Sequence, residues 1–332
     1  MQILKPAYFD EFQCLAGRCP DSCCKEWEVE IDDRTAAYYR SLPGALGDRL
    51  RAVLKDDPEW GTVMTIQDGR CPMWCDDGLC RIQAELGHDA LCKTCREFPR
   101  LCHDYGTFRE YGLELSCPEA ARLILNTENN AFLTEDVPGS DTPGYDEDAM
   151  AVLLETRKTA LELIGNDNFS VPKMLTLLLY YGYHAQSLLD CCDTPDFCEE
   201  ALLAEARELA ISGGEQDLVD FFATLEILTP QWEDRLAAPL SPAPWTNQFR
   251  NLAHYFVERY WLQAVSDYDL AGRIKFIVAS CLLVHLLGGD TVATAQLYSK
   301  EIENSDENVD SILDAAYSHP ALTDQRLLGM LV

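Results

Sequence analysis

Cysteine is the residue type whose number and placement most clearly predict chemistry in this 332-residue chain. Eleven of the 15 cysteines lie within the first 120 residues: Cys14, Cys19, Cys23, Cys24, Cys71, Cys75, Cys80, Cys92, Cys95, Cys102 and Cys117. Thiolates select soft metal centres, including zinc and iron–sulfur clusters. We therefore predict metal or redox chemistry in this part of the chain, and not a disulfide framework.

The first four cysteines have an unusual spacing, Cys14-x4-Cys19-x3-Cys23-Cys24. A zinc finger normally pairs two ligands about two to four residues apart and repeats that pair once, which this segment does not do. Adjacent side chains point in different directions in most backbone conformations. We therefore expect Cys23 and Cys24 to serve different ends of a polynuclear site, or two separate sites. The Cys-x3-Cys-x2-Cys motif of radical S-adenosylmethionine enzymes is absent from the sequence.

The elements that must hold these cysteines are predicted to be short and irregular. Alternating apolar residues predict short strands near residues 27–31 and 63–66. Short helices are predicted over residues 81–86 and 118–125, which places Cys117 at a helix N-terminus, where a thiolate is stabilised. Because apolar periodicity is weak here, we expect folding of this segment to be coupled to metal binding.

The remainder of the chain is patterned as a succession of amphipathic helices, with apolar residues recurring at spacings of three and four. The predicted helices are 149–164, 171–189, 197–211, 215–228, 245–266, 270–287, 291–303 and 308–317. We predict a mainly α protein. A cysteine-rich metal-binding module with short helices and a few short strands (residues 1–128) precedes a linker (129–148) and an all-α helical bundle (149–332).

Acidic residues dominate the charge of the chain. It has 56 Asp+Glu against 26 Lys+Arg, a formal charge of -30 at pH 7, which argues against binding to nucleic acid or an anionic membrane and favours a basic partner. The longest apolar stretch, residues 274–287, includes Lys275 and His285 and is too short to span a bilayer. The N-terminal residues contain no apolar signal segment. We therefore predict a cytoplasmic protein with no nucleic-acid or membrane partner.

Four cysteine-bearing segments together resemble one known family. They are FQCLAGRCPDSCCKEWEVEID (12–32), RCPMWCDDGLCRI (70–82), LCKTCREFPR (91–100) and LSCPEAARLIL (115–125). In this order they resemble the flagellin lysine-N-methylases, which belong to the CxxCxxCC group of zinc- or iron-chelating proteins. The resemblance implies a 4Fe-4S cluster, with zinc as the alternative metal. It also implies S-adenosylmethionine as methyl donor, and lysines of flagellin or of another lysine-bearing protein as substrate.

The resemblance also implies which residues bind the metal. The family's recurring cysteines fall on Cys14, Cys19, Cys23, Cys24, Cys71, Cys80, Cys95 and Cys117. Cys75, Cys92 and Cys102 are ranked lower because they look optional in the family. Arg100 is a candidate for cofactor binding, because its planar guanidinium can donate two hydrogen bonds to a carboxylate. The alternative is that Arg100 is a structural arginine, either exposed or ion-paired. The sequence contains no strand-like segment followed by a G-x-G-x-x-G turn. The usual methyltransferase sheet is therefore not predicted.

These observations support the hypothesis of an S-adenosylmethionine-dependent protein-lysine N-methyltransferase that modifies flagellin and uses a cysteine-bound iron–sulfur cluster. Two alternatives stay open, a non-catalytic protein with a structural zinc site and an iron–sulfur redox protein. Eight thiols are enough for two four-thiolate centres, but their number does not choose between zinc and iron. The four later cysteines are expected to be spare thiols: Cys191, Cys192, Cys198 and Cys281.

Overall fold

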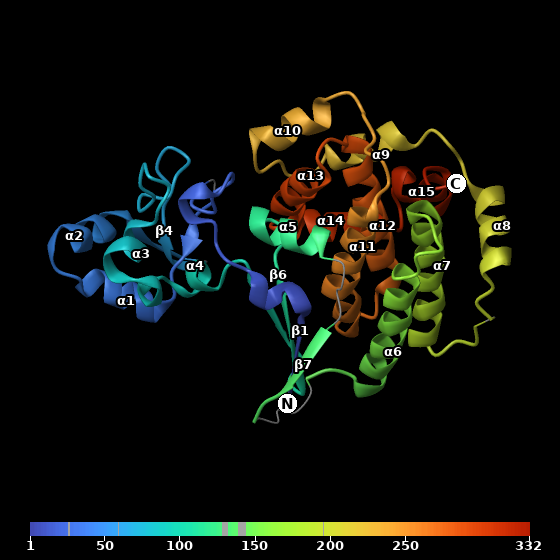
Figure 1. Ribbon diagram of the computed structural model, residues 1–332, viewed down its shortest axis with the longest axis horizontal. Helices are drawn as coiled ribbons and strands as arrows, with labels where there is room; N and C mark the ends of the chain where they lie inside the picture. Colours follow the sequence, from blue (N-terminus) through green and yellow to red (C-terminus); the bar gives the residue numbers. More distant parts are fainter. Residues whose placement is uncertain (26, 59, 128–131, 139–143, 195) are drawn as a thin grey trace. The chain divides into compact units, whose positions relative to one another are not determined.

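The computed structural model describes residues 1–332 except residues 26, 59, 128–131, 139–143 and 195 (Figure 1). The described chain forms two compact units. The cysteine unit comprises Phe12–Leu101 and Cys117–Glu119, and the helical unit comprises Met1–Glu11, Cys102–Ser116 and Ala120–Val332.

The two units do not follow chain order, because strand pairing draws the N-terminus into the helical unit. Strand β1 (Gln2–Pro6) pairs in parallel with β6 (Phe108–Leu113) and antiparallel with β7 (Phe132–Asp136). The boundaries therefore differ from the predicted division into residues 1–128 and 149–332. Strand β7 lies inside the predicted linker, of which residues 129–131 and 139–143 are outside the described residues.

The cysteine unit combines a small antiparallel sheet with short helices. The sheet has the order β2-β4-β3, formed by β2 (Val29–Glu30), β4 (Gly61–Met64) and β3 (Leu54–Asp57). The helices are α1 (Asp33–Ser41), α2 (Gly44–Val53), α3 (Arg81–Leu86) and α4 (Lys93–Glu97), with 3-10 turns at Ala16–Arg18 and His88–Ala90. These elements bury a core of their own, which comprises Val29, Ile31, Ala36, Tyr39, Leu50, Val53, Met64, Met73, Ile82, Leu91 and Cys92.

The helical unit contains a four-stranded sheet of order β5-β6-β1-β7, in which β5 (Arg100–Asp104) is an edge strand. Its helices are α5 (Pro118–Asn126), α6 (Glu147–Ile164), α7 (Val171–Leu189), α8 (Glu199–Leu209), α9 (Glu215–Phe222), α10 (Pro230–Ala237), α11 (Asn247–Tyr260), α12 (Leu270–Leu287), α13 (Thr291–Tyr298), α14 (Asp306–Ala315) and α15 (Asp324–Gly329). A short 3-10 segment precedes α12 (Trp261–Val265), and a π segment follows α13 (Ser299–Glu303). The mainly α fold class is confirmed.

Helix α12 lies at the centre of the helical unit and packs against α7 and α11 (Figure 1). Within the described part of the chain it is long and apolar enough to cross a membrane by length and composition, but 83% of its 18-residue window is buried inside the protein. Burial of this kind is expected of a core helix, which can be apolar all round.

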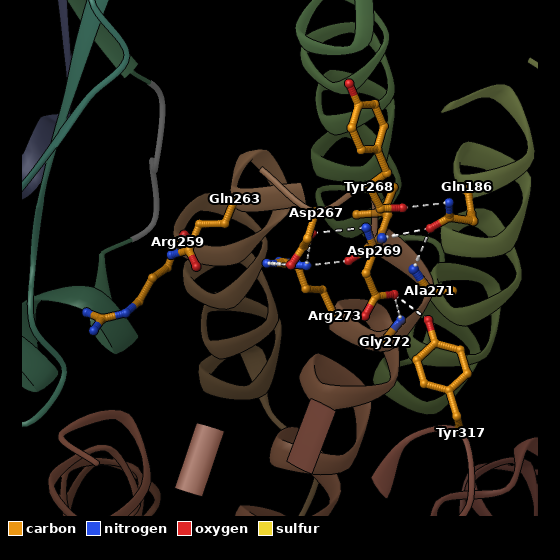
Figure 2. Close-up of polar contacts among 11 residues, drawn as sticks. Gln186, Arg259, Gln263, Asp267, Tyr268, Asp269, Ala271, Gly272, Arg273 and Tyr317 are labelled. Carbon is orange, nitrogen blue, oxygen red and sulfur yellow. Dashed lines mark hydrogen bonds and ion pairs between the residues drawn. The ribbon is translucent and has the colours of Figure 1, made fainter. Parts of the chain in front are cut away.

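Polar side chains fix where α12 begins (Figure 2). Asp269 caps the helix by accepting a hydrogen bond from the Gly272 N–H at 2.8 Å. The side-chain oxygen of Gln186, in α7, accepts from the N–H groups of Leu270 and Ala271 at 2.7 and 2.9 Å. All three N–H groups belong to the first turn of α12, where backbone donors have no partner within the helix. These contacts therefore fix the start of α12, and those of Gln186 also join it to α7.

Candidate metal centre

Two loops of the cysteine unit touch each other through glycines. A methyl group added at Gly17 would lie 2.7 Å from the carbonyl oxygen of Asp77, and one added at Gly78 would lie 2.9 Å from the Cα of Gly17. Gly78 also has a φ of +78°, a conformation that side chains disfavour. The approach holds the loop before Cys19 against the turn before Cys80.

A backbone hydrogen bond joins the first cysteine segment to the second. The N–H of Cys71 donates to the carbonyl oxygen of Cys24 at 2.8 Å, and Lys25 and Arg70 form an antiparallel bridge beside it. The Cys71 sulfur lies 3.5 Å from the sulfur of Met64, a buried residue of β4. Cys71 is therefore fixed between Cys24 and the apolar core of the unit.

The third cysteine segment is positioned by Asp32, the residue before α1. Its Oδ1 accepts from the Thr35 N–H at 3.0 Å, which caps α1, and its Oδ2 accepts from the Lys93 N–H at 2.9 Å, in the first turn of α4. Burial raises the pKa of Asp32, but these donors outweigh burial and hold it below its usual range. One carboxylate thus holds together the starts of two helices, the second of which contains Cys95.

Tyr39, which is fully buried in α1, also positions the third cysteine segment. Its hydroxyl donates to the carbonyl oxygen of Ala90 at 2.7 Å, just before Cys92. Burial raises the pKa of Tyr39, and the charges of Cys92, Cys95 and Cys80 raise it further. The phenol of Tyr39 therefore lies close enough to the cysteines of this unit to respond to their charge.

The thiols form two hydrogen-bonded pairs. The pair Cys23 and Cys24 shares a hydrogen bond, which raises the pKa of Cys23 and lowers that of Cys24 to about 7. The pair Cys92 and Cys95 does the same, with the pKa of Cys92 lowered and that of Cys95 raised. In each pair the side chain with the lowered pKa is the acceptor, since a hydrogen bond to the thiolate favours the charged form.

Cys24 is the thiol whose charge affects the pKa values of most of the other predicted ligands. Burial raises the pKa values of Cys19, Cys71 and Cys80, and the charge of Cys24 raises each of them further. Cys24 also raises the pKa of Cys95, after the larger effect of the Cys92 hydrogen bond. The charges of Cys14 and Cys117 raise the pKa of Cys23 after the larger effects of Cys24 and burial, and the charge of Cys23 raises that of Cys95.

The chemistry of this donor set fits a soft metal centre. Burial raises the pKa values of Cys19, Cys71 and Cys80, and the charges of neighbouring thiols raise them further, so as thiolates these groups repel their neighbours until a cation compensates their charge. As placed, no three Cys, His, Asp or Glu side chains of the described residues are arranged to coordinate one ion. The division of the eight cysteines between metal centres therefore stays a prediction.

The lower-ranked cysteines divide between the two units. Cys75 and Cys92 lie in the cysteine unit among the predicted ligands. Cys102 lies on β5 in the helical unit, where it is exposed and hydrogen bonds to Tyr111. Cys102 is therefore the first residue after the boundary of the cysteine unit at Leu101.

Arg100, the predicted cofactor-binding residue, is exposed, and its guanidinium lies over the ring of Phe12 at 5.1 Å from the centroid. It forms no ion pair with any described residue. The guanidinium is thus free to accept a carboxylate, although the stacking contact is also what an exposed structural arginine makes. Its role in cofactor binding stays a prediction.

The residues that bring the cysteine segments together have only weak signals in the sequence. Asp32 precedes the first residues of a helical pattern, which is the sequence signal of an N-cap, but its second acceptor bond to Lys93 has no local signal. Gly17 and Gly78 each lie among cysteines and polar residues, where glycine usually indicates a turn. Their contact with each other depends on tertiary structure and could not be found by spacing.

Comparison with known proteins identifies the family. The chain is 30% identical over 190 residues to the lysine-N-methylases of Salmonella typhimurium and Salmonella choleraesuis, an alignment that covers 55% of this chain and 47% of each relative. It is 34% identical over 139 residues to the flagellar biosynthetic protein FliU of Salmonella muenchen, covering 40% of this chain and 82% of FliU. The chain belongs to this lysine-N-methylase and FliU family.

Family membership confirms the resemblance that the four cysteine segments predicted. The chain spans about half the length of the two lysine-N-methylases it matches, since 47% of each is covered. No protein-family model matches the chain, and no solved structure is similar to it.

Proposed function

We propose that this protein is an S-adenosylmethionine-dependent protein-lysine N-methyltransferase that acts on flagellin in the cytoplasm. The observation that carries the proposal is the 34% identity across 82% of FliU, together with the identity to proteins named lysine-N-methylase. The gathering of the predicted cysteine ligands in one unit supports a metal-dependent version of this activity.

The residues that would hold a 4Fe-4S cluster are the eight predicted cysteines: Cys14, Cys19, Cys23, Cys24, Cys71, Cys80, Cys95 and Cys117. A cluster held by three cysteines would supply an open iron for the amino and carboxylate groups of the donor, whereas a fully ligated cluster would be structural. The guanidinium of Arg100 would donate hydrogen bonds to the donor carboxylate. Zinc is the alternative metal for the same thiols.

Methyl transfer sets a clear requirement on the substrate lysine. The lysine ammonium would first lose a proton. Its nitrogen lone pair would then attack the methyl carbon of the donor sulfonium, and the carbon–sulfur bond would break with its electron pair passing to sulfur. A lysine of ordinary pKa, about 10.4, is almost wholly protonated at neutral pH, so the enzyme must favour release of that proton. The net charge of -30 attracts lysine-bearing surfaces, while proton release requires a drier environment.

The test is mass spectrometry of flagellin after incubation with the anaerobically purified full chain and S-adenosylmethionine. The chain offers a matched control, because it contains two adjacent cysteine pairs. Cys23→Ser with Cys24→Ser should abolish metal binding and methylation. Cys191→Ser with Cys192→Ser, an exposed pair in the helical unit, should change neither.

Metal analysis and an absorption spectrum of the same preparations separate the alternatives. Iron with methylated flagellin is the expected result. Stoichiometric zinc without iron would exclude the cluster, and iron without any methylation of flagellin would favour a redox protein. Equal activity in both double variants would contradict the involvement of the cysteine centre.

A further inference from the structure

A cavity of about 1170 Å³ lies within the helical unit, between the end of α5, one face of α6 and the start of α11. Its apolar wall includes Leu154 and Leu161 of α6 and Phe132 of β7, and its polar wall includes Asn247 and Gln248 of α11. Small-molecule sites commonly have about 300–1000 Å³, so the cavity can hold a ligand as large as a nucleoside linked to an amino acid.

Basic residues are concentrated around this cavity. Residues 131–332 contain 11 Lys+Arg against 33 Asp+Glu. Three of those cations, Arg157, Lys158 and Arg250, line the cavity, together with two carboxylates, Glu162 and Asp167. Cations therefore make up a larger share of the charged residues in the lining than in the surrounding chain.

Arg157 supports the wall and is not available for a ligand anion. Its Nη1 and Nη2 donate to the two carboxylate oxygens of Glu110 at 2.8 and 2.5 Å, and both side chains are only 6% exposed. The guanidinium also lies 5.7 Å from the ring centroid of Phe132. The buried pair therefore holds the aromatic side of the cavity in place.

The other two cations have no carboxylate partner among the described residues. Arg250, which is 9% exposed, donates Nη1 to the carbonyl oxygen of Ile164 and Nη2 to that of Phe169, and its Nε finds no partner in the described part of the chain. Lys158 is exposed and forms no ion pair with any described residue. Lys158 and Arg250 thus line the cavity without an ion-pair partner among the described residues.

Free negative groups lie in the same lining. Glu162 and Asp167 are exposed and form no ion pair with described residues. Glu162 is four residues after Lys158 in α6, so the two side chains leave the same helix face one turn apart. The cavity therefore has both positive and negative side chains beside an apolar and aromatic wall. Such a lining suits a ligand that carries both charges and an aromatic ring.

We propose that this cavity binds the methyl donor, S-adenosylmethionine. Lys158 and Arg250 attract its carboxylate, Glu162 and Asp167 attract its ammonium and sulfonium groups, and its adenosyl part packs along the apolar wall. The identity of the ligand rests on the proposed function, whereas the chemistry of the site rests on the lining residues. This site is an alternative to donor binding at Arg100 and the cysteine centre, and it predicts that Arg100 of the cysteine unit is not required for donor affinity.

The first test changes the shape of the cavity at a residue whose replacement does not disturb the core. Leu154 lines the cavity and is 37% exposed, and Leu188, on α7 and outside the lining, is 36% exposed. Leu154→Trp should raise the dissociation constant of S-adenosylmethionine at least about tenfold, since a bulky ring occupies ligand volume. Leu188→Trp should leave it unchanged. Isothermal titration of the full, metal-loaded chain measures both.

The second test changes charge at the cavity. Lys158→Glu should weaken binding of the donor by about tenfold, because one attractive interaction with its carboxylate becomes repulsive. Arg207→Glu makes the same change of charge at an exposed position of α8 outside the lining and should have little effect. Adenosine, which has no carboxylate, should bind both variants equally.

The outcomes separate this proposal from the proposed function. If the wild-type chain binds the donor but all four variants bind it equally well, the cavity is not the donor site and the methyltransferase proposal is unaffected. If the wild-type chain binds no donor and methylates no flagellin, both proposals are wrong. If Arg100→Ala weakens donor binding as much as Lys158→Glu, assignment to the helical unit is overturned.

Discussion

Replacing Gly78 by alanine should damage the cysteine centre, whereas the same replacement at Gly44 should not. Both glycines have positive φ, +78° and +76°, so both replacements carry a backbone cost of about 1–2 kcal/mol. Only Gly78 faces another chain segment, because its added methyl would lie 2.9 Å from the Cα of Gly17. A methyl group at Gly44 would meet nothing within 4 Å.

The difference between the two variants follows from contact distances. Carbon atoms pack at about 3.5–4.0 Å, so the two loops must separate by about 0.5–1 Å to accept the new methyl group. Metal–ligand distances tolerate only about 0.2 Å. We therefore expect Gly78→Ala to lose metal as well as an additional 1–3 kcal/mol, roughly, of stability from overpacking. Gly44→Ala should keep its metal.

The assay combines metal content per chain with denaturant unfolding of each variant. Gly17→Ala provides an independent check, since Gly17 has no positive φ and its added methyl would lie 2.7 Å from the Asp77 oxygen. It should lose metal without the backbone cost. Equal metal content in wild type, Gly17→Ala and Gly78→Ala would refute the idea that this contact positions the ligands.

Three further predictions concern stability. Glu110→Gln should lower the free energy of unfolding by about 3–5 kcal/mol in denaturant titrations, because it leaves Arg157 buried without its counter-charge, whereas Asp48→Asn in an exposed pair should cost under about 1 kcal/mol. Asp32→Ala should cost about 1–2 kcal/mol and increase hydrogen exchange at the starts of α1 and α4 together. Burial lowers the pKa of His285 in the folded state, so the unfolded state binds the proton more readily and stability falls as the pH drops below about 6.5. His285→Phe should remove part of that dependence, measured as unfolding free energy against pH.

The helices of the second half were predictable because their signals are local. The predicted ranges 171–189 and 270–287 match α7 and α12 to the residue, since each has a capping side chain before its first turn. Helices α10 and α15 were not predicted. Helix α10 has local signals that could have indicated it, since Thr229 caps its first turn and Pro230 is its first residue, whereas α15 has only six residues and offers little periodicity. The all-α prediction for this part of the chain is confirmed in the described residues.

The strands of the helical unit were not predictable, because their pairing is distant in sequence. Strand β1 shows no clean alternation, yet Gln2 pairs with Phe108 on one side and with Asp136 on the other. Only the complete sheet makes these segments strands. The predicted division at residues 128 and 149 could not anticipate an N-terminus that joins the helical unit.

The site was predictable in composition and not in arrangement. Cysteine density predicted a metal centre and the family resemblance implied its ligands, and this ligand set stays a prediction. Whether Cys23 and Cys24 serve different sites also stays a prediction, since the charges of both raise the pKa of Cys95. The cysteines themselves come from segments far apart in the chain. Contacts such as Gly17 with Gly78, and Asp32 with Lys93, decide which cysteines meet.

The apolar core of the cysteine unit bears on what a metal contributes to folding. Cys92 is part of that core, and Cys71 and Cys80 pack against it, so these thiols are held by apolar burial as well as by any metal. Cys14 and Cys23 are exposed and have no such support. A metal shared between the two groups would tie the exposed first segment to a scaffold that already has a core. Its main structural effect would then be to order the surface loops, while the core that holds α1 and α2 rests on hydrophobic burial.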